Sequence, residues 1–116
     1  MKITAAMSIL FVMGASPVFA DCTSPDDTKV VIPSGAQATR DEMVAAQSAV
    51  KAFDAAVSAY SDCLKQDEGT KVAAGGDKVK VHAELVKLNN EAVMKLQLIA
   101  DKFNEELRAF KAKATQ

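Results

Sequence analysis

Cys22 and Cys63 are the only cysteines in the chain, and they carry its most informative chemistry. Cys22 lies two residues past an apparent signal-peptidase site, which indicates export to an oxidising compartment. Two cysteines in one small exported chain usually pair with each other, so we expect a disulfide between them. Because a disulfide removes both thiolates, this pair predicts architecture and makes a redox or nucleophilic role less favoured.

His82 is the single histidine and the other side chain with obvious chemical potential. In an antiparallel helical register it would fall near Tyr60 and Cys63, which suggests a Cys–His nucleophile or half of a metal site. No further His or Cys completes such a site, so a partly solvated, hydrogen-bonded histidine is favoured. A small-ligand or metal site formed by His82 and Tyr60 stays open as an alternative.

Other polar patterns give weak support for an enzyme. Glu105 and Glu106 adjoin on a predicted helix surface without a facing carboxylate for acid–base catalysis. Asp26 and Asp27 are not followed by a loop of alternating oxygen ligands, as a calcium site requires. The chain also has no CxxC pair and no phosphate-binding glycine loop. We therefore predict a non-enzyme with no catalytic residues, no metal and no cofactor.

Residues 1–20 have the three parts of a secretory signal peptide: a positive start, a short apolar run and a small-residue end. Val18 and Ala20 stand where a signal peptidase reads, so cleavage is expected after Ala20. A retained N-terminal anchor is the alternative. A lipidated Cys22 is disfavoured because Asp21, not a small residue, precedes it. We predict a periplasmic or secreted protein whose mature chain has no transmembrane segment.

The size and charge of the chain narrow its class further. It has 116 residues and a formal net charge of −1, which argues against nucleic acid or an anionic membrane as a partner. A chain this short forms one small domain with a thin core. A disulfide contributes most to stability in such a domain.

Heptad spacing of apolar residues predicts two long helices, at about 40–68 and about 78–113. Thr39 and Glu42 are spaced as a capping box at the start of the first helix. Asp77 is placed to cap the second. Both helices are therefore delimited by residues with a physical reason to start them.

A short loop over residues 69–77, with Gly69 as the expected stop of the first helix, joins the two. We predict an all-α, coiled-coil-like antiparallel hairpin over residues 39–116. The predicted seam of the first helix comprises Met43, Ala46, Val50, Phe53, Val57, Tyr60 and Leu64. The seam of the second comprises Val79, Val86, Val93, Ala100 and Leu107 together with His82, Asn89, Leu96, Phe103 and Phe110. Asn89 is the polar seam residue that would fix the register.

Residues 21–38 form a tail that contains Pro25 and Pro33 and is predicted to be extended. A stripe of small residues on the first helix leads to Cys63 and would let another backbone approach closely. These residues are Ala45, Ala49, Ala52, Ala56 and Ala59. We expect the tail to run back along this stripe as a strap tied by the disulfide. The strap would insert its apolar cluster, Val30, Val31 and Ile32, between the helices, and this surface is our candidate for interactions.

A partner chain could occupy the same groove in place of the strap. The broad apolar face of the second helix suits a homodimer that forms a four-helix bundle, and the disulfide could then be intermolecular. We favour the intramolecular strap because paired cysteines in one small chain usually join each other.

The tail and first helix resemble a group of small secreted or periplasmic helical-hairpin proteins of Gram-negative bacteria whose function is not known. The resemblance rests on a Cys-Pro tail, an Ile-Pro-x-Gly step and a Tyr-x-x-Cys-Leu motif. Here these are Cys22 and Pro25, Ile32-Pro33-Ser34-Gly35, and Tyr60-Ser61-Asp62-Cys63-Leu64. The resemblance implies an envelope location and assigns no active residues.

These observations lead to three hypotheses of function. The first is a scaffold, adaptor or chaperone-like component of the cell envelope that contacts another protein, because the apolar surface exceeds what two helices need to pack. The second is a binder of a small ligand or metal at the His82 end of the hairpin. The third is a secreted effector.

Overall fold

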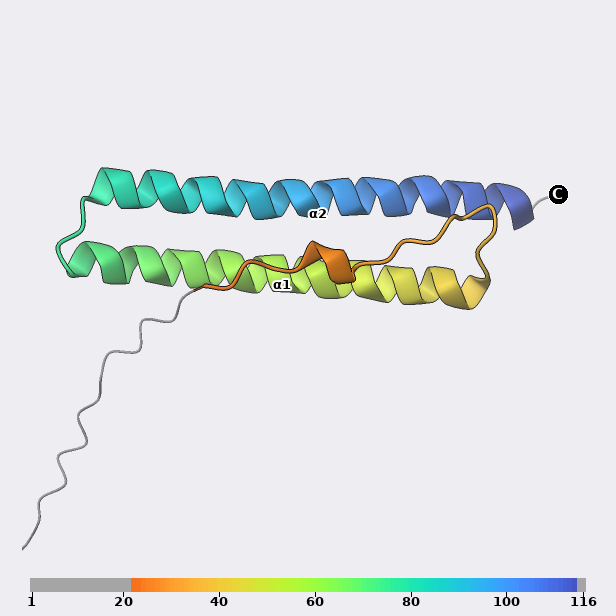
Figure 1. Ribbon diagram of the computed structural model, residues 1–116, viewed down its shortest axis with the longest axis horizontal. Helices are drawn as coiled ribbons and strands as arrows, with labels where there is room; N and C mark the ends of the chain where they lie inside the picture. The colour runs from red at the N-terminus through yellow and green to blue at the C-terminus, as the bar shows by residue number, and fades with distance from the viewer. Residues whose placement is uncertain (1–21, 115–116) are drawn as a thin grey trace, which may run out of the picture.

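A computed structural model of the protein describes residues 22–114 as two long antiparallel helices with an extended segment laid against them (Figure 1). The helices are α1, Arg40–Ala73, and α2, Lys78–Ala114. The extended segment, residues 22–38, is here called the strap, and it contains one short 3₁₀ turn, η1, at Asp27–Lys29. No strand occurs within these residues, so the predicted all-α hairpin is confirmed.

The disulfide joins Cys22 to Cys63 of the same chain across a sequence separation of 41. It fixes the start of the strap to the second half of α1. The pairing is therefore intramolecular, as the favoured sequence interpretation predicted. The expected signal peptide, residues 1–20, lies outside the described residues.

The start of α1 is set by its capping box. The amide of Glu42 donates to Thr39 Oγ1 at 3.2 Å, and the amide of Thr39 donates to Glu42 Oε2 at 2.7 Å. These two bonds satisfy amides that have no partner inside the helix. The helix therefore begins where the sequence predicted.

The end of α1 lies further along the chain than predicted. Gly69 does not stop the helix, which continues to Ala73. The amides of Gly75 and Gly76 close it instead, donating to the carbonyls of Val72 at 3.1 Å and Lys71 at 3.0 Å. This Schellman pattern needs a residue with positive φ, and Gly75 supplies it at 96°. Glycine stops a helix only where the backbone turns, and at Gly69 the backbone stays helical.

α2 starts at Lys78, two residues after Gly76, and is capped by Asp77. Its Oδ1 accepts the amides of Val79 at 3.0 Å and Lys80 at 3.1 Å. The tight glycine turn and this cap together reverse the chain, and they place α2 alongside α1.

The core lies between the helices in two clusters. The larger, toward the loop, contains Phe53, Val57, Tyr60, Leu64, Leu85 and Ala92. The smaller, toward the termini, contains Ala38, Met43, Ala46 and Phe103. All these buried residues except Ala38 belong to the helices, so the hairpin supplies most of its own core.

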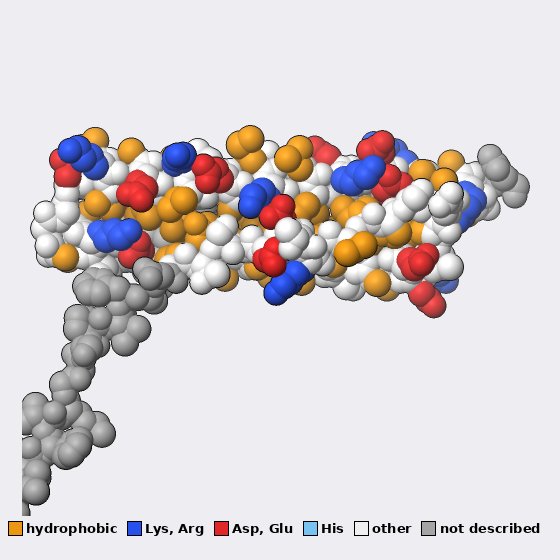
Figure 2. Space-filling model, in the orientation of Figure 1, with side chains coloured by type: hydrophobic (Ala, Val, Ile, Leu, Met, Phe, Trp, Pro, Cys, Tyr) orange, Lys and Arg blue, Asp and Glu red, His pale blue; other side chains and the backbone are white. Residues whose placement is uncertain are grey.

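The first two residues of one predicted row of α2 lie outside this core, whereas Val93 and Leu107 of the same row pack against it. Val79 is 78% exposed and Val86 is 42% exposed. At 100° per residue, Val86 lies about 120° around the helix from the buried Ala92. The strap covers the other side of the helix pair, so burial shifts toward that side and away from the Val79–Val86 row. Figure 2 shows the strap side, where hydrophobic side chains gather between the helices and charged side chains lie among and around them.

Candidate functional site

The strap lies over the groove between α1 and α2. The side chains of its apolar cluster, Val30, Val31 and Ile32, point in two opposite directions. Val30 packs against the larger core cluster and Ile32 against the smaller one. Val31 points away and is 73% exposed, so its predicted insertion is wrong. An extended backbone sends successive side chains to opposite sides, and three consecutive residues therefore cannot all face one groove.

The end of the strap is fixed to α2 by main-chain contacts. The amide of Gly35 donates to Glu106 Oε2 at 2.7 Å, and Lys113 Nζ donates to the Ala38 carbonyl at 2.6 Å. Gly35 lies so close to the backbone of α2 that an added Cβ would be 1.7 Å from the main-chain oxygen of Glu106. In Figure 1 this part of the strap rises toward α2 before it returns to the start of α1. Glycine is thus required here by close approach, not by backbone conformation.

Two carboxylates on this face have lowered pKa values. A hydrogen bond from Lys102, followed by the amide of Gly35, lowers the pKa of Glu106 from its ordinary value. Hydrogen bonds from the side chain and amide of Thr28 lower the pKa of Asp26. Both carboxylates therefore stay ionised at neutral pH, and they act as acceptors that hold the strap in shape.

The alanine stripe of α1 lies beside the strap and is not buried under it. Ala45, Ala52, Ala56 and Ala59 are exposed, and Ala49 is half-buried. The strap therefore runs along the stripe, as expected, but beside it, with grooves between the two. The strap is drawn toward α2 because Val30 and Ile32 bury more surface between the helices than on a flat row of methyl groups. Asp27 also bonds Lys95 of α2 at 3.2 Å.

Two shallow grooves separate the strap from the alanine stripe. Their volumes are about 370 Å³ and about 310 Å³, and they share Lys29 and Ala49. The first is lined by Pro25, Asp26, Lys29, Val30, Ala49, Ala52, Phe53 and Ala56. The second is lined by Lys29, Val31, Pro33, Glu42, Ala45, Ala46 and Ala49. The floor is made mostly of small apolar side chains with charged groups at the rim, a surface that suits van der Waals contact.

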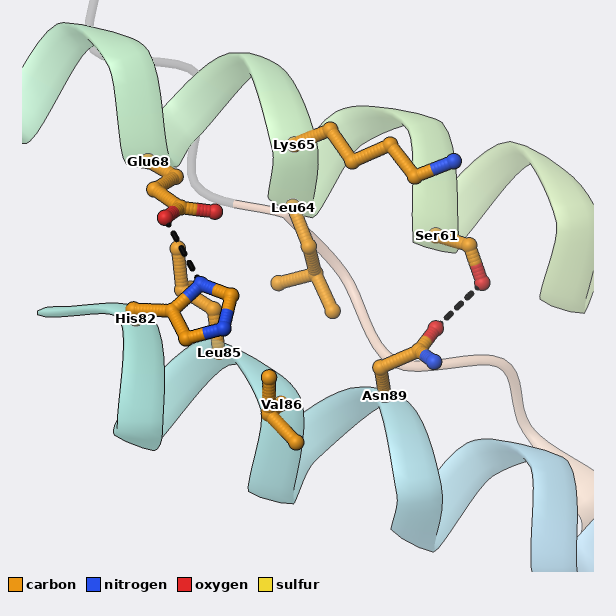
Figure 3. Close-up of a pocket in the computed structure, with 8 residues that line it drawn as sticks. All are labelled: Ser61, Leu64, Lys65, Glu68, His82, Leu85, Val86 and Asn89. Carbon is orange, nitrogen blue, oxygen red and sulfur yellow. Dashed lines mark hydrogen bonds and ion pairs between the residues drawn. The ribbon is translucent and has the colours of Figure 1, made fainter.

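A separate cleft of about 150 Å³ lies between the helices near the loop (Figure 3). His82 Nδ1 lies 2.8 Å from Glu68 Oε1, and Ser61 Oγ donates to Asn89 Oδ1 across the helix pair. The remaining lining residues are Leu64, Lys65, Leu85 and Val86. Asn89 therefore makes an inter-helix hydrogen bond, consistent with its predicted role in fixing the register.

The structure separates His82 from the residues expected beside it. Tyr60 is 6% exposed in the larger core cluster and does not line the cleft. Cys63 is bonded to Cys22, the first described residue of the strap. His82 faces Glu68, so the sequence paired it with the wrong neighbours. Glu68 lies five residues beyond Cys63, about 7.5 Å further along α1 and about 140° around it, so the expected register was wrong as well.

The cleft offers little chemistry of its own. The described residues contain no group of three or more His, Cys, Asp or Glu side chains placed to hold a metal ion. The His82 and Glu68 side chains are 62% and 28% exposed, which leaves their contact largely solvated. Leu64, Leu85 and Val86 give the cleft an apolar wall.

On the strap face, the sequence indicates one ion pair within α2 but none of the contacts between α2 and the strap. Lys102 and Glu106 fit a pair four residues apart on an exposed helix, and their 2.7 Å contact confirms that spacing. The second bond of Glu106, to Gly35, spans 71 residues and depends on where the strap lies. Lys29 and Lys113 gave no such signal, because their positions depend on the tertiary structure.

Comparisons with known proteins give no relative: no family model, curated protein or solved structure matches this chain. Among the described residues, neither helix has a stretch long and apolar enough to cross a membrane.

Proposed function

We propose that this protein is an exported, non-enzymatic interaction module that works as a scaffold, adaptor or chaperone-like component of the cell envelope. The observation that supports this proposal is the pair of adjoining grooves between the strap and the alanine stripe. Their alanine floor stays open to solvent although it lies directly beside an apolar strap. Small side chains let a partner backbone approach closely, and the charged groups Asp26, Lys29 and Glu42 at the rim can bond to a polar partner.

An export route fits this role. The leader-like residues 1–20 and the disulfide are both compatible with an oxidising compartment. The proposed location is the periplasm or the exterior, where a partner in the envelope would be met. A tagged full-length chain fractionated from cells tests this: recovery from the cytoplasm with residues 1–20 intact would overturn the location.

The interaction role is tested by crosslinking in intact cells with a groove-blocking variant. Ala52→Arg places a long charged side chain in the groove from an exposed position, so it should abolish capture of a specific envelope protein. Ala83→Arg is the matched control, because Ala83 is an exposed alanine of α2 that lines neither groove. If both variants capture the same proteins as the unmodified chain, the grooves are not the contact surface.

A second candidate function is the binding of a small apolar ligand in the cleft near His82. It is supported by an apolar wall with two polar pairs at the rim, the arrangement common in ligand sites. A thermal-shift screen of metals and apolar ligands tests it. A shift that disappears in His82→Ala would support it, and a flat screen would remove it.

The third hypothesis, a secreted effector, differs from the first in where the protein ends up. Export would carry the mature chain past the envelope into the medium. Immunoblots of culture medium and periplasmic extract distinguish the two, since an envelope component stays with the cells.

A further inference from the structure

The strap is held to the helices in two different ways along its length. Its second half, from Ile32 to Ala38, is fixed by noncovalent contacts. Ile32 packs on the smaller core cluster, and the Gly35 amide bonds Glu106 at 2.7 Å. The Ala38 carbonyl accepts from Lys113 at 2.6 Å, and Ala38 is 4% exposed. This half is anchored to both helices without help from the disulfide.

The first half, residues 22–31, has much weaker noncovalent attachment. Its one side-chain hydrogen bond to a helix joins Asp27 to Lys95, and both side chains are more than 40% exposed. Val30 packs on the larger core cluster, whereas Val31 is 73% exposed. The hydrogen bonds of Asp26 and Thr28 stay within the strap itself. Exposed ion pairs contribute little, so the disulfide is the main attachment of this half.

The first half contributes no fully buried residue to the core. The ten buried core residues lie on the helices, apart from Ala38 in the anchored second half. Releasing residues 22–31 would withdraw only the partly buried Cys22 and Val30 from the larger cluster. Local opening without loss of the hairpin is therefore physically available.

We propose that the Cys22–Cys63 disulfide is a redox latch that controls residues 22–31 of the strap, while residues 32–114 keep the hairpin fold. Reduction frees this half about a hinge at Ile32 and Pro33. The release uncovers the core surface beneath Val30 and removes the strap wall of the larger groove. The latch operates whether or not the groove binds a protein.

The reaction is an ordinary thiol–disulfide exchange with a dithiol reductant. One thiolate of the dithiol attacks the sulfur of Cys22 or of Cys63 and forms a mixed disulfide with it. The sulfur of the other cysteine leaves as a thiolate. The second thiol of the reductant then displaces the remaining sulfur. Two electrons pass from the dithiol to the pair, the dithiol becomes a disulfide, and Cys22 and Cys63 end as thiols. Both cysteines are partly exposed, which leaves them open to this attack.

Limited trypsin digestion of the full chain tests the latch. One sample stays oxidised, and the other is reduced with dithiothreitol, capped with iodoacetamide and freed of reductant. Lys29 is exposed and lies in the first half of the strap. We expect cleavage after Lys29 to be at least about tenfold faster in the reduced sample. Cleavage after Lys51 and Lys87, inside the helices, should be unchanged.

The Cys22→Ser, Cys63→Ser double variant should match the reduced sample without any reductant, and circular dichroism of both should keep the helical signal. Reoxidation of uncapped reduced protein should restore protection at Lys29. Equal cleavage at Lys29 in the oxidised and reduced samples would overturn the latch. Loss of helical signal, or equal acceleration at Lys51 and Lys87, would also overturn it, because the disulfide would then hold the whole fold.

Discussion

The two faces of the hairpin are closed by different means. The strap face carries a disulfide, two apolar strap residues inserted between the helices and main-chain bonds from Gly35 and Ala38 to α2. The opposite face has side-chain pairs between the helices, such as Ser61 with Asn89 and His82 with Glu68. Long-range covalent and main-chain contacts thus gather on one face.

The difference shows how a chain with two helices obtains a third layer. Two helices alone leave their shared groove open on both sides, and the strap fills one side with Val30 and Ile32. The other side keeps the cleft and the exposed Val86. Changes on the strap face should therefore alter stability more than changes on the cleft face.

The largest effect is expected from removing the disulfide. Cys22→Ser with Cys63→Ser should lower the free energy of unfolding by about 3 to 4 kcal/mol, because the unfolded chain regains the entropy of an open loop. Urea unfolding followed by circular dichroism measures it. Ser61→Ala on the cleft face is the comparison, with an expected loss of about 1 kcal/mol or less. Equal losses from the two faces would end the distinction between them.

A pair of glycine substitutions sharpens the comparison. Gly35→Ala should destabilise the protein by about 1 to 3 kcal/mol, because its Cβ would overlap the main chain of α2 near Glu106. Gly69→Ala should stabilise it by about 0.5 to 1 kcal/mol, since Gly69 is helical with nothing within 4 Å of an added Cβ. Thermal unfolding measures both changes in stability, the loss for Gly35→Ala and the gain for Gly69→Ala. A tolerated Gly35→Ala would show that the strap does not approach α2 so closely.

The strap face should also respond to acid through Glu106. The pKa of Glu106 is lowered in the folded protein, so ionised Glu106 stabilises the fold at pH values above its pKa in the unfolded chain, near 4.5. This contribution is lost as the pH falls through the lower pKa of the folded state. Glu106→Gln should flatten the decline of stability below about pH 4.5, measured by urea unfolding at several pH values. The flattening should be partial, because Asp26 has a lowered pKa as well. Glu105→Gln is the neighbouring control, and an equal change there would remove the special role of Glu106.

The smallest effect is expected at the cleft. His82→Ala should change the free energy of unfolding by no more than about 0.5 kcal/mol, because the histidine side chain is 62% exposed. Chemical denaturation of the oxidised protein measures it. A loss as large as that of Gly35→Ala would show that the cleft face also holds the fold.

The sequence by itself determined the features that depend on local chemistry. Thr39 with Glu42 and Asp77 mark the helix starts through bonds to amides within three residues, and the structure has both. The heptad rows gave the antiparallel hairpin, and the two cysteines gave the disulfide. The caps and helices are encoded in neighbouring residues or in a period, and the disulfide follows from the chain having only two cysteines, so none of them needed tertiary information.

The tertiary structure alone decided where the strap lies and which side chains meet. Whether Gly69 or Gly75 ends α1 depends on which of them the chain turns at. His82 meets Glu68 and not Cys63, because the packing of the two helices brings His82 level with a residue about 7.5 Å further along α1. The strap lies between the helices and not on the alanines, since burying Val30 and Ile32 there outweighs contact with a row of methyl groups. These outcomes are set by competition between surfaces far apart in sequence, which no local pattern records.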